Sequence, residues 1–239
     1  MIALSVNVNK VALLRNARGG NNPDLLRVAQ DCVRWGAHGI TVHPRPDERH
    51  IRKVDVSALK AALQVELNVE GYPSEDFLQM IEAVRPAQCT LVPDPPHVLT
   101  SSEGWDTLTH QSLLQDVVAR LKASGVRVSL FIEPDERRIE YAARTGAHRV
   151  ELYTGPYAAQ YLTQPSAAVA PYLRAGQAAR ALGVGLNAGH DLDTQNLRYL
   201  AQHLPWLQEV SIGHALVCDA LYWGLERTIA AYLACLKTA

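Results

Sequence analysis

Short β-branched or apolar runs alternate with longer amphipathic stretches along the chain, and this alternation constrains the fold more than any other feature. Eight runs have strand character, at residues 3–8, 39–42, 66–69, 90–93, 126–132, 150–152, 185–188 and 209–212. Eight amphipathic stretches accompany them, at residues 23–35, 56–63, 74–84, 108–123, 136–144, 167–182, 194–203 and 215–236. Several of these stretches end at a glycine, as helices commonly do, namely Gly36, Gly125, Gly146 and Gly183.

Eight strand–helix units in strict alternation predict an α/β protein, and more specifically a (β/α)8 TIM barrel. A chain of 239 residues with 48% apolar residues can bury one large core, so we expect a single domain over residues 1–239. A doubly wound open sheet is the alternative, but it gives no reason to stop at eight equivalent units. The glycine-rich phosphate-binding signatures of dinucleotide-binding and P-loop folds are both absent from the sequence.

Charge and cysteine content argue against several classes of function. The formal net charge is −1, whereas nucleic-acid and membrane-surface binders carry a clear excess of lysine and arginine. The cysteines are far apart and form no Cys-x-x-Cys pair, which argues against a zinc knuckle or a disulfide framework. The sequence shows no secretion signal and no apolar stretch of spanning length. We therefore expect a cytoplasmic protein without nucleic-acid or membrane partners.

Polar side chains collect where the predicted strands end. In a barrel of this type the carboxyl ends of the strands meet at one mouth, where active sites lie. In chain order, the strands bring to that mouth Asn7, Asn9 and Lys10; His43 and Arg45; Glu70; the loop with Thr100; Glu133; Glu151; Asn187 and His190; and Gly213 and His214. Each residue alone is better explained as a cap or turn residue, but their convergence predicts an active site with several acid–base groups.

The segment after the second strand combines imidazole and guanidinium groups. Pro44 and Pro46 cannot donate hydrogen bonds to a sheet, so the chain must leave the barrel wall at His43. Arg45 and His50 follow closely in the sequence. We therefore expect the polar groups of this segment to gather at the carboxyl end of the strand, where parallel α/β folds place their sites.

Two further features predict binding of phosphate groups. Residues 187–190 and 212–214 place small residues just before predicted helices, whose free N–H groups attract anions, although simple helix capping explains them equally well. The loop 15–20 carries Arg15 and Arg18 beside two glycines and suits a phosphate or carboxylate, although it can also be a solvated basic loop. A metal site is not favoured, because the histidines at the strand ends form no His-x-His or helical His pair.

Taken in order, these motifs resemble those of the pyridoxine 5'-phosphate synthase family of vitamin B6 biosynthesis. The match covers nearly the whole chain, and its motifs lie at residues 14–19, 39–45, 49–51, 67–70, 91–93, 128–132, 187–190 and 212–215. The resemblance implies a TIM barrel that condenses 1-deoxy-D-xylulose 5-phosphate with 3-amino-2-oxopropyl phosphate, giving pyridoxine 5'-phosphate, phosphate and water. It implies that the ligands are these two small phosphorylated substrates and that no redox or metal cofactor takes part. It also implies a homo-oligomer, specifically an octamer.

The resemblance also implies a role for individual residues. The implied catalytic residues are His43 and Glu70 as proton acceptors, His190 as proton donor and Glu151 in support of a transition state. The implied contacts to the pentulose phosphate are Arg45, His50 and Thr100, and those to the aminoketone phosphate are Asn7, Arg18, Gly213 and His214. The loop between Pro93 and Gly104 is a candidate lid that would shield reactive intermediates from water.

Some positions depart from the family pattern. Asn9 and Lys10 stand where the family usually has Asp and His, and Asp191 stands where it has Gly; we expect all three to contact substrate. Two alternatives follow: another phosphosugar-handling barrel enzyme, such as an epimerase or isomerase, or a homologue that binds a phosphorylated ligand without turning it over. Because His43, Glu70 and His190 are all present, the sequence favours an active synthase.

Overall fold

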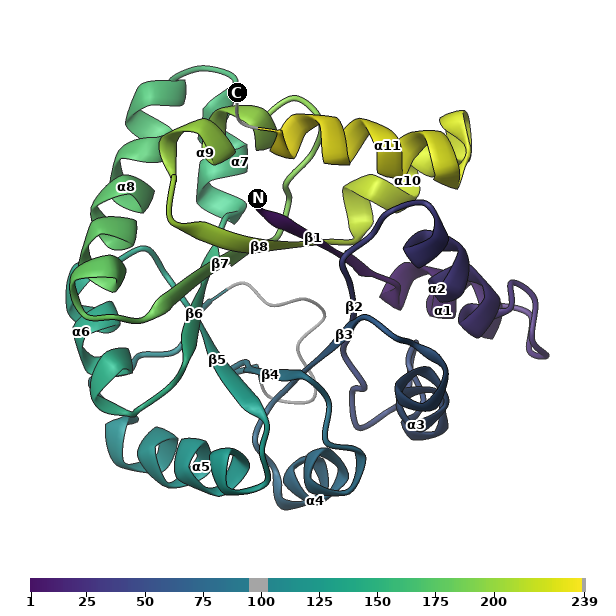
Figure 1. The fold of residues 1–239 in the computed structure, drawn as a ribbon, viewed down its shortest axis with the longest axis horizontal. Helices are drawn as coiled ribbons and strands as arrows, with labels where there is room; N and C mark the ends of the chain where they lie inside the picture. The colour runs from purple at the N-terminus through teal and green to yellow at the C-terminus, as the bar shows by residue number, and fades with distance from the viewer. Residues whose placement is uncertain (95–102, 238–239) are drawn as a thin grey trace.

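Eight parallel strands pair in chain order and close into a barrel, which the helices surround (Figure 1). The computed structural model describes residues 1–94 and 103–237. The strands are β1 (Ala3–Asn7), β2 (Gly39–Val42), β3 (Glu66–Gly71), β4 (Gln88–Leu91), β5 (Arg127–Ile132), β6 (Arg149–Tyr153), β7 (Gly185–Gly189) and β8 (Leu207–Ile212). The predicted single-domain (β/α)8 TIM barrel is confirmed.

The helices largely follow the predicted stretches. They are α1 (Asn9–Asn16), α2 (Leu25–Arg34), α3 (Lys53–Ala62), α4 (Glu75–Val84), α5 (Gln111–Ala123), α6 (Glu136–Arg144), α7 (Gly155–Tyr161), α8 (Pro165–Ala181), α9 (Leu197–His203), α10 (His214–Trp223) and α11 (Leu225–Leu236). The short helices α1 and α7 were not predicted. The last predicted helix is divided in two by Gly224, whose φ of 78° is a left-handed conformation that glycine adopts without steric cost.

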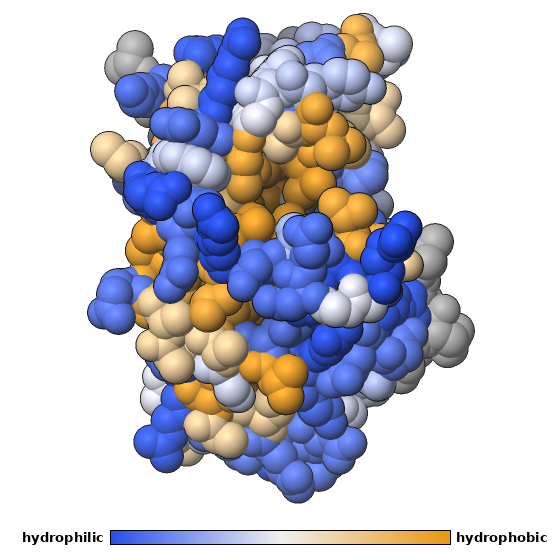
Figure 2. All heavy atoms as spheres, turned by 90° about the vertical axis from the view of Figure 1, so that its right-hand side faces the viewer, coloured by the Kyte–Doolittle hydropathy of each residue, from blue (hydrophilic) through white to orange (hydrophobic). Residues whose placement is uncertain are grey.

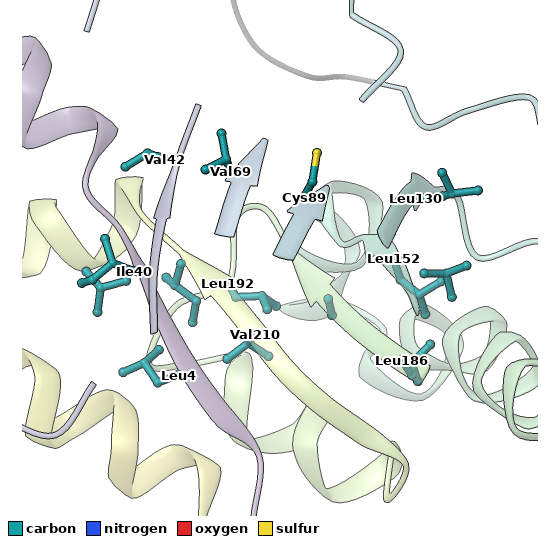
Figure 3. Close-up of a cluster of buried hydrophobic side chains, with 14 of the residues drawn as sticks. Leu4, Ile40, Val42, Val69, Cys89, Leu130, Leu152, Leu186, Leu192 and Val210 are labelled. Carbon is teal, nitrogen blue, oxygen red and sulfur yellow. The ribbon is translucent and has the colours of Figure 1, made fainter. Parts of the chain in front are cut away.

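The main apolar core lies between the barrel and the surrounding helices. Along most of the strands, apolar residues alternate with polar or small ones, because successive side chains point to opposite faces. Leu4, Ile40, Val69 and Leu186 belong to the apolar set, and all are nearly inaccessible to solvent (Figure 3). Burial of this continuous apolar face against the helices is the main force that holds the barrel together.

Polar side chains fill the inside of the barrel, an arrangement that the sequence analysis did not predict. Gln88 on β4 donates a hydrogen bond to Glu209 on β8 (3.3 Å), although these two strands do not pair, so both side chains must point toward the barrel axis. Thr90 donates to Asn68 (3.0 Å) in the same interior. Beyond the effect of burial, the charge of Glu209 raises the pKa of both Glu70 and Glu151, so the protonation of one carboxyl group affects the others.

Arg15 corrects one expectation from the sequence. It lies within α1 rather than in an open loop, and it is only 2% exposed. Its guanidinium donates to both carboxylate oxygens of Asp55 on α3 (2.8 and 2.9 Å) and to the backbone carbonyl of His50 (3.1 Å). Arg15 therefore fastens α1 to α3 and to the segment that carries His50, and it does not bind a phosphate. Arg18 lies in the exposed turn that follows α1.

Three observations concern other kinds of site. Within residues 1–94 and 103–237, no helix is long and apolar enough to cross a membrane. The same residues contain no group of three or more His, Cys, Asp or Glu side chains that could hold a metal ion. All four cysteines are free thiols.

Candidate active site

A cavity of about 420 Å³ opens at the carboxyl ends of the strands. Most of the predicted site residues line it, namely Asn7, Asn9, Lys10, His43, Arg45, His50, Glu70, Glu151, His190, Asp191, Gly213 and His214. Of the other residues expected at the mouth, Arg18 is exposed and does not line the described part of the cavity, and Thr100 lies outside the described residues, as does most of the candidate lid. Glu133 and Asn187 do not line it either, because Glu133 pairs with Arg138 and Asn187 accepts a hydrogen bond from Arg149. The strand ends therefore meet as the sequence predicts.

His43 and Glu70 face each other across this cavity. His43 follows the end of β2, Glu70 lies near the end of β3, and the His43 Nδ1 atom is 3.9 Å from the Glu70 Oε2 atom. Pro44 follows His43 directly, so the backbone turns out of the sheet at this residue. The two side chains are only 9% and 13% exposed, so each could exchange a proton with a ligand in the cavity largely shielded from water.

Burial shifts the pKa values of this pair in opposite directions. Burial lowers the pKa of His43 well below its usual range, and the positive charge of Arg45 lowers it further. Burial raises the pKa of Glu70, with Asp94 adding to the rise and Arg45 opposing it. At neutral pH His43 is therefore a neutral imidazole that can accept a proton, while Glu70 keeps its proton at a higher pH than an exposed glutamate.

Glu151 adds a second carboxyl group to the site, on the side of the barrel interior. It lies in the middle of β6 and is 2% exposed. Thr90 donates to its Oε2 atom at 3.4 Å. Burial raises the pKa of Glu151 well above its usual range, and the nearby charge of Glu70 raises it further. Two buried carboxyl groups that oppose each other's ionisation resemble the paired acids of known active sites.

Arg45 and Asp94 form a buried ion pair beside these groups. The Arg45 Nη2 atom lies 3.2 Å from the Asp94 Oδ2 atom, and the two side chains are 4% and 5% exposed. Asp94 directly follows the predicted fourth strand, a position that could have marked it as a site residue, but the sequence analysis passed over it for Thr100. The sequence analysis also assigned no role to Arg49, which lines the cavity and pairs with Asp47 at 2.7 Å.

His50 is the last of the cavity-lining residues on the segment after β2. The backbone N–H of Ile51 donates to its Nδ1 atom at 2.9 Å, which leaves the ring proton on the Nε2 atom of a neutral imidazole. Burial lowers the pKa of His50 to about 4, with Arg45 and Arg49 contributing. Near neutral pH His50 can therefore donate a hydrogen bond to an anion but carries no charge of its own.

Asn9 shows how one departure from the family pattern is accommodated. Its Oδ1 atom accepts the backbone N–H of His43 at 2.9 Å, and its own backbone N–H donates to the Asn7 Oδ1 atom at 3.0 Å. The Asn9 side chain thus ties the start of α1 to the end of β2. Lys10, next in the chain, brings a positive charge to the cavity wall.

The turn after β7 differs from its predicted form. His190 and Asp191 line the cavity, but α9 begins only at Leu197, so residues 187–190 do not lie at a helix N-terminus and cannot bind a phosphate in the expected way. Burial lowers the pKa of His190, while the charges of Asp191 and Asp94 oppose this effect. A Cβ atom at Gly189 would lie 2.4 Å from the Glu151 Oε1 atom, so a larger residue here would displace that carboxyl group.

The turn after β8 agrees with its predicted form. Helix α10 begins at His214, directly after Gly213, and both residues line the cavity. A Cβ atom on Gly213 would approach the Asn7 side chain to 3.0 Å, so glycine allows β1 and the start of α10 to come together here. The first N–H groups of α10 have no partner within the helix, as at every helix start, which suits an anion in the cavity.

The barrel and its cavity define a TIM-barrel enzyme, with acid–base and cationic side chains gathered at the carboxyl ends of the strands. The particular family is shown by sequence. The chain belongs to the family described as pyridoxal phosphate biosynthesis protein PdxJ, whose sequence profile matches residues 4–238.

Individual relatives agree with this assignment, and solved structures of other proteins share the fold. A pyridoxine 5'-phosphate synthase of Porphyromonas gingivalis is 60% identical over 232 residues, covering 97% of this chain and 98% of the relative. One of Phocaeicola vulgatus is 57% identical over 238 residues, covering 100% of both. Phosphoribosylanthranilate isomerase of Thermotoga maritima shares the fold with a TM-score of 0.60, at 16% identity and 99% coverage of both chains. Tryptophan synthase of M. tuberculosis also shares the fold, with a TM-score of 0.65 at 15% identity, and the match covers 100% of this chain and 93% of that one.

Proposed function

We propose that this protein is a pyridoxine 5'-phosphate synthase that joins 1-deoxy-D-xylulose 5-phosphate and 3-amino-2-oxopropyl phosphate, with release of phosphate and water. The observation that carries the proposal is that His43, Glu70 and His190 line one cavity in a chain whose full-length relatives bear this name. Amine attack, loss of water, elimination of phosphate and ring closure each move protons, so a cavity with several acid–base groups suits this reaction.

In the proposed mechanism, His43 and Glu70 accept protons from the reacting carbon and nitrogen atoms. A neutral imidazole suits this task, and the lowered pKa of His43 keeps its ring neutral near pH 7. His190 donates a proton to a leaving oxygen, which requires that it first becomes protonated. Bound phosphate groups favour this, because a nearby negative charge raises the pKa of an imidazole. Glu151 supports a transition state from the barrel side of the cavity.

Two phosphorylated substrates need two anion sites. We assign Arg45, His50 and Thr100 to the pentulose phosphate, with Arg45 as the charged group and His50 as a neutral donor. We assign Gly213 and His214 at the start of α10, with Asn7 and Arg18, to the aminoketone phosphate. Asn9, Lys10 and Asp191 line the same cavity and would contact substrate between these sites.

The raised pKa of Glu70 predicts how activity depends on pH. Glu70 can act as a base only when it is ionised, so a raised pKa means that kcat/KM is gained as pH rises through that higher value. We expect kcat/KM to keep increasing above pH 6, where an exposed glutamate is already fully ionised. Rates measured from pH 5 to 9 test this. In Asp94→Asn the increase in kcat/KM should begin at lower pH, because the Asp94 charge helps to raise the pKa of Glu70. If the increase begins at the same pH as in wild type, the assignment of Glu70 as the base is contradicted.

Phosphate release provides the first test of the function. Purified protein should release inorganic phosphate only when both substrates are present. Consumption of one substrate alone would favour a phosphosugar isomerase or epimerase instead. Binding of the substrates without any release of phosphate would favour a homologue that has lost turnover.

We also propose that the protein assembles with copies of itself, as an octamer by family resemblance, and acts in the cytoplasm. Large apolar side chains are exposed on α1 and at the end of α10, namely Leu13 and Leu14 (43% and 57% exposed) and Leu221, Tyr222 and Trp223 (75%, 87% and 40%). Figure 2 shows apolar side chains gathered on the side of the molecule where α1 and α10 lie. An apolar patch of this kind is typical of a surface that another subunit covers.

A paired substitution tests this interface. Leu221→Glu combined with Tyr222→Glu should give a smaller assembly than wild type in size-exclusion chromatography with light scattering, because buried charges oppose association. Leu162→Glu is the matched control, since Leu162 is 74% exposed but lies at the end of α7. An unchanged mass for the double variant would exclude this face as the interface.

A further inference from the structure

Thr154 makes a contact that the proposed mechanism does not use. It directly follows β6 and is completely buried. Its single hydroxyl proton is shared between the backbone carbonyl of Gly189, at 2.6 Å, and that of His190. Its own backbone N–H donates to the Gly189 carbonyl at 2.9 Å. One threonine at the end of β6 thus binds the backbone of the turn that carries His190.

That turn adopts a conformation that needs such support. His190 and Asp191 have φ values of 83° and 54°, in the left-handed region that residues with a Cβ atom seldom occupy. Backbone strain of this kind persists only where the surroundings enforce it, and it is common at functional sites. Asn196 holds the other side of the turn, because its Nδ2 atom donates to the Asp191 carbonyl at 3.1 Å.

The imidazole of His190 contacts two aromatic rings. Its ring lies 5.1 Å from the Phe131 ring and 5.4 Å from the Tyr153 ring, measured between centroids. These two aromatic rings also contact each other, at 5.5 Å. The imidazole therefore packs against aromatic side chains from β5 and β6 while it lines the cavity. A shift of the backbone at residues 189–190 would move the ring away from them.

We propose that Thr154 is a positioning residue, whose hydroxyl group holds the backbone of residues 189–190 so that the His190 imidazole stays against Phe131 and Tyr153 and reaches the substrate. The effect on turnover rests on the proposed function, because it acts through the proton that His190 donates. Valine and serine separate the two properties of threonine. Thr154→Val keeps the shape and removes the hydroxyl group, whereas Thr154→Ser keeps the hydroxyl group and removes a methyl group.

Kinetics of the two variants provide the first test. We expect Thr154→Val to lower kcat by roughly 10- to 100-fold, the size of effect that a misplaced catalytic group produces, with little change in KM. Thr154→Ser should stay close to wild type. If Thr154→Val keeps wild-type kcat, or if serine is as damaging as valine, the hydroxyl group has no positioning role. If the valine variant does not fold, Thr154→Ala replaces it, with the same expected result.

Crystal structures of the variants provide a second test that does not depend on activity. In Thr154→Val, His190 should leave its left-handed conformation and its ring should lose contact with Phe131 and Tyr153, whereas Thr154→Ser should keep both features. An unchanged turn in the valine variant would overturn the proposal. A wild-type protein that forms no product would refute the proposed function, while this structural comparison would still decide the role of Thr154.

Discussion

Replacement of Glu70 by glutamine is expected to lower kcat by about 10²- to 10⁴-fold, which is the contribution of a positioned general base. Glutamine has the shape of protonated glutamic acid and cannot accept the proton. Because burial already raises the pKa of Glu70, the site tolerates a neutral side chain, and the fold should not be weakened. Steady-state kinetics give kcat and KM, and calorimetry with inorganic phosphate tests whether anion binding is retained.

Glu66→Gln is the matched control for this substitution. Glu66 begins the same strand, β3, but lies at the opposite end of the barrel, where it pairs with Arg127. We expect this variant to have wild-type kcat. If Glu70→Gln retained normal turnover, Glu70 would not be a base; if it lost phosphate binding to the same extent as activity, Glu70 would be a structural residue.

Arg15→Met is expected to lower the free energy of unfolding by about 3 kcal/mol, because it leaves a largely buried carboxylate without its main partner. The estimate is at the low end of the usual range because the Asp55 side chain keeps 13% exposure and a hydrogen bond from the Arg52 backbone N–H at 2.8 Å. Methionine preserves much of the apolar packing of the arginine stem. Urea denaturation at a fixed protein concentration gives the value.

Arg18→Met provides the comparison within the same basic stretch of sequence. Arg18 is exposed, so its replacement should change the free energy of unfolding by less than about 0.5 kcal/mol. Equal destabilisation by the two substitutions would contradict the structural role assigned to Arg15. The two variants thus separate a buried guanidinium from an exposed one.

The fold was predictable because its strongest signals are local. Apolar runs and glycine-terminated amphipathic stretches predicted all eight strands, and β2 matched at both ends. The helices α1 and α7 were missed because each is short and begins two residues after a strand ends. The polar barrel interior was missed for another reason: residues such as Gln88 and Glu209 meet only after the barrel closes.

Much of the cavity wall was predictable because strand ends converge in a barrel, whatever the side chains are. Partners from distant segments were not predictable. The sequence shows Arg15 in a basic stretch, but only the structure brings it to Asp55, and only the structure shows that Asp94 pairs with Arg45. The support that Thr154 gives to His190 also joins residues far apart in the sequence. The roles of individual residues in binding and proton transfer remain predictions.

Isotope labelling tests the central claim most directly. Wild-type protein is incubated with aminoketone phosphate labelled at its nitrogen and pentulose phosphate labelled at its carbon atoms, and the products are weighed by mass spectrometry. The synthase account predicts pyridoxine 5'-phosphate that carries both labels, with free phosphate in equal amount. Absence of a doubly labelled product, under conditions where the Porphyromonas gingivalis relative forms it, would contradict the account.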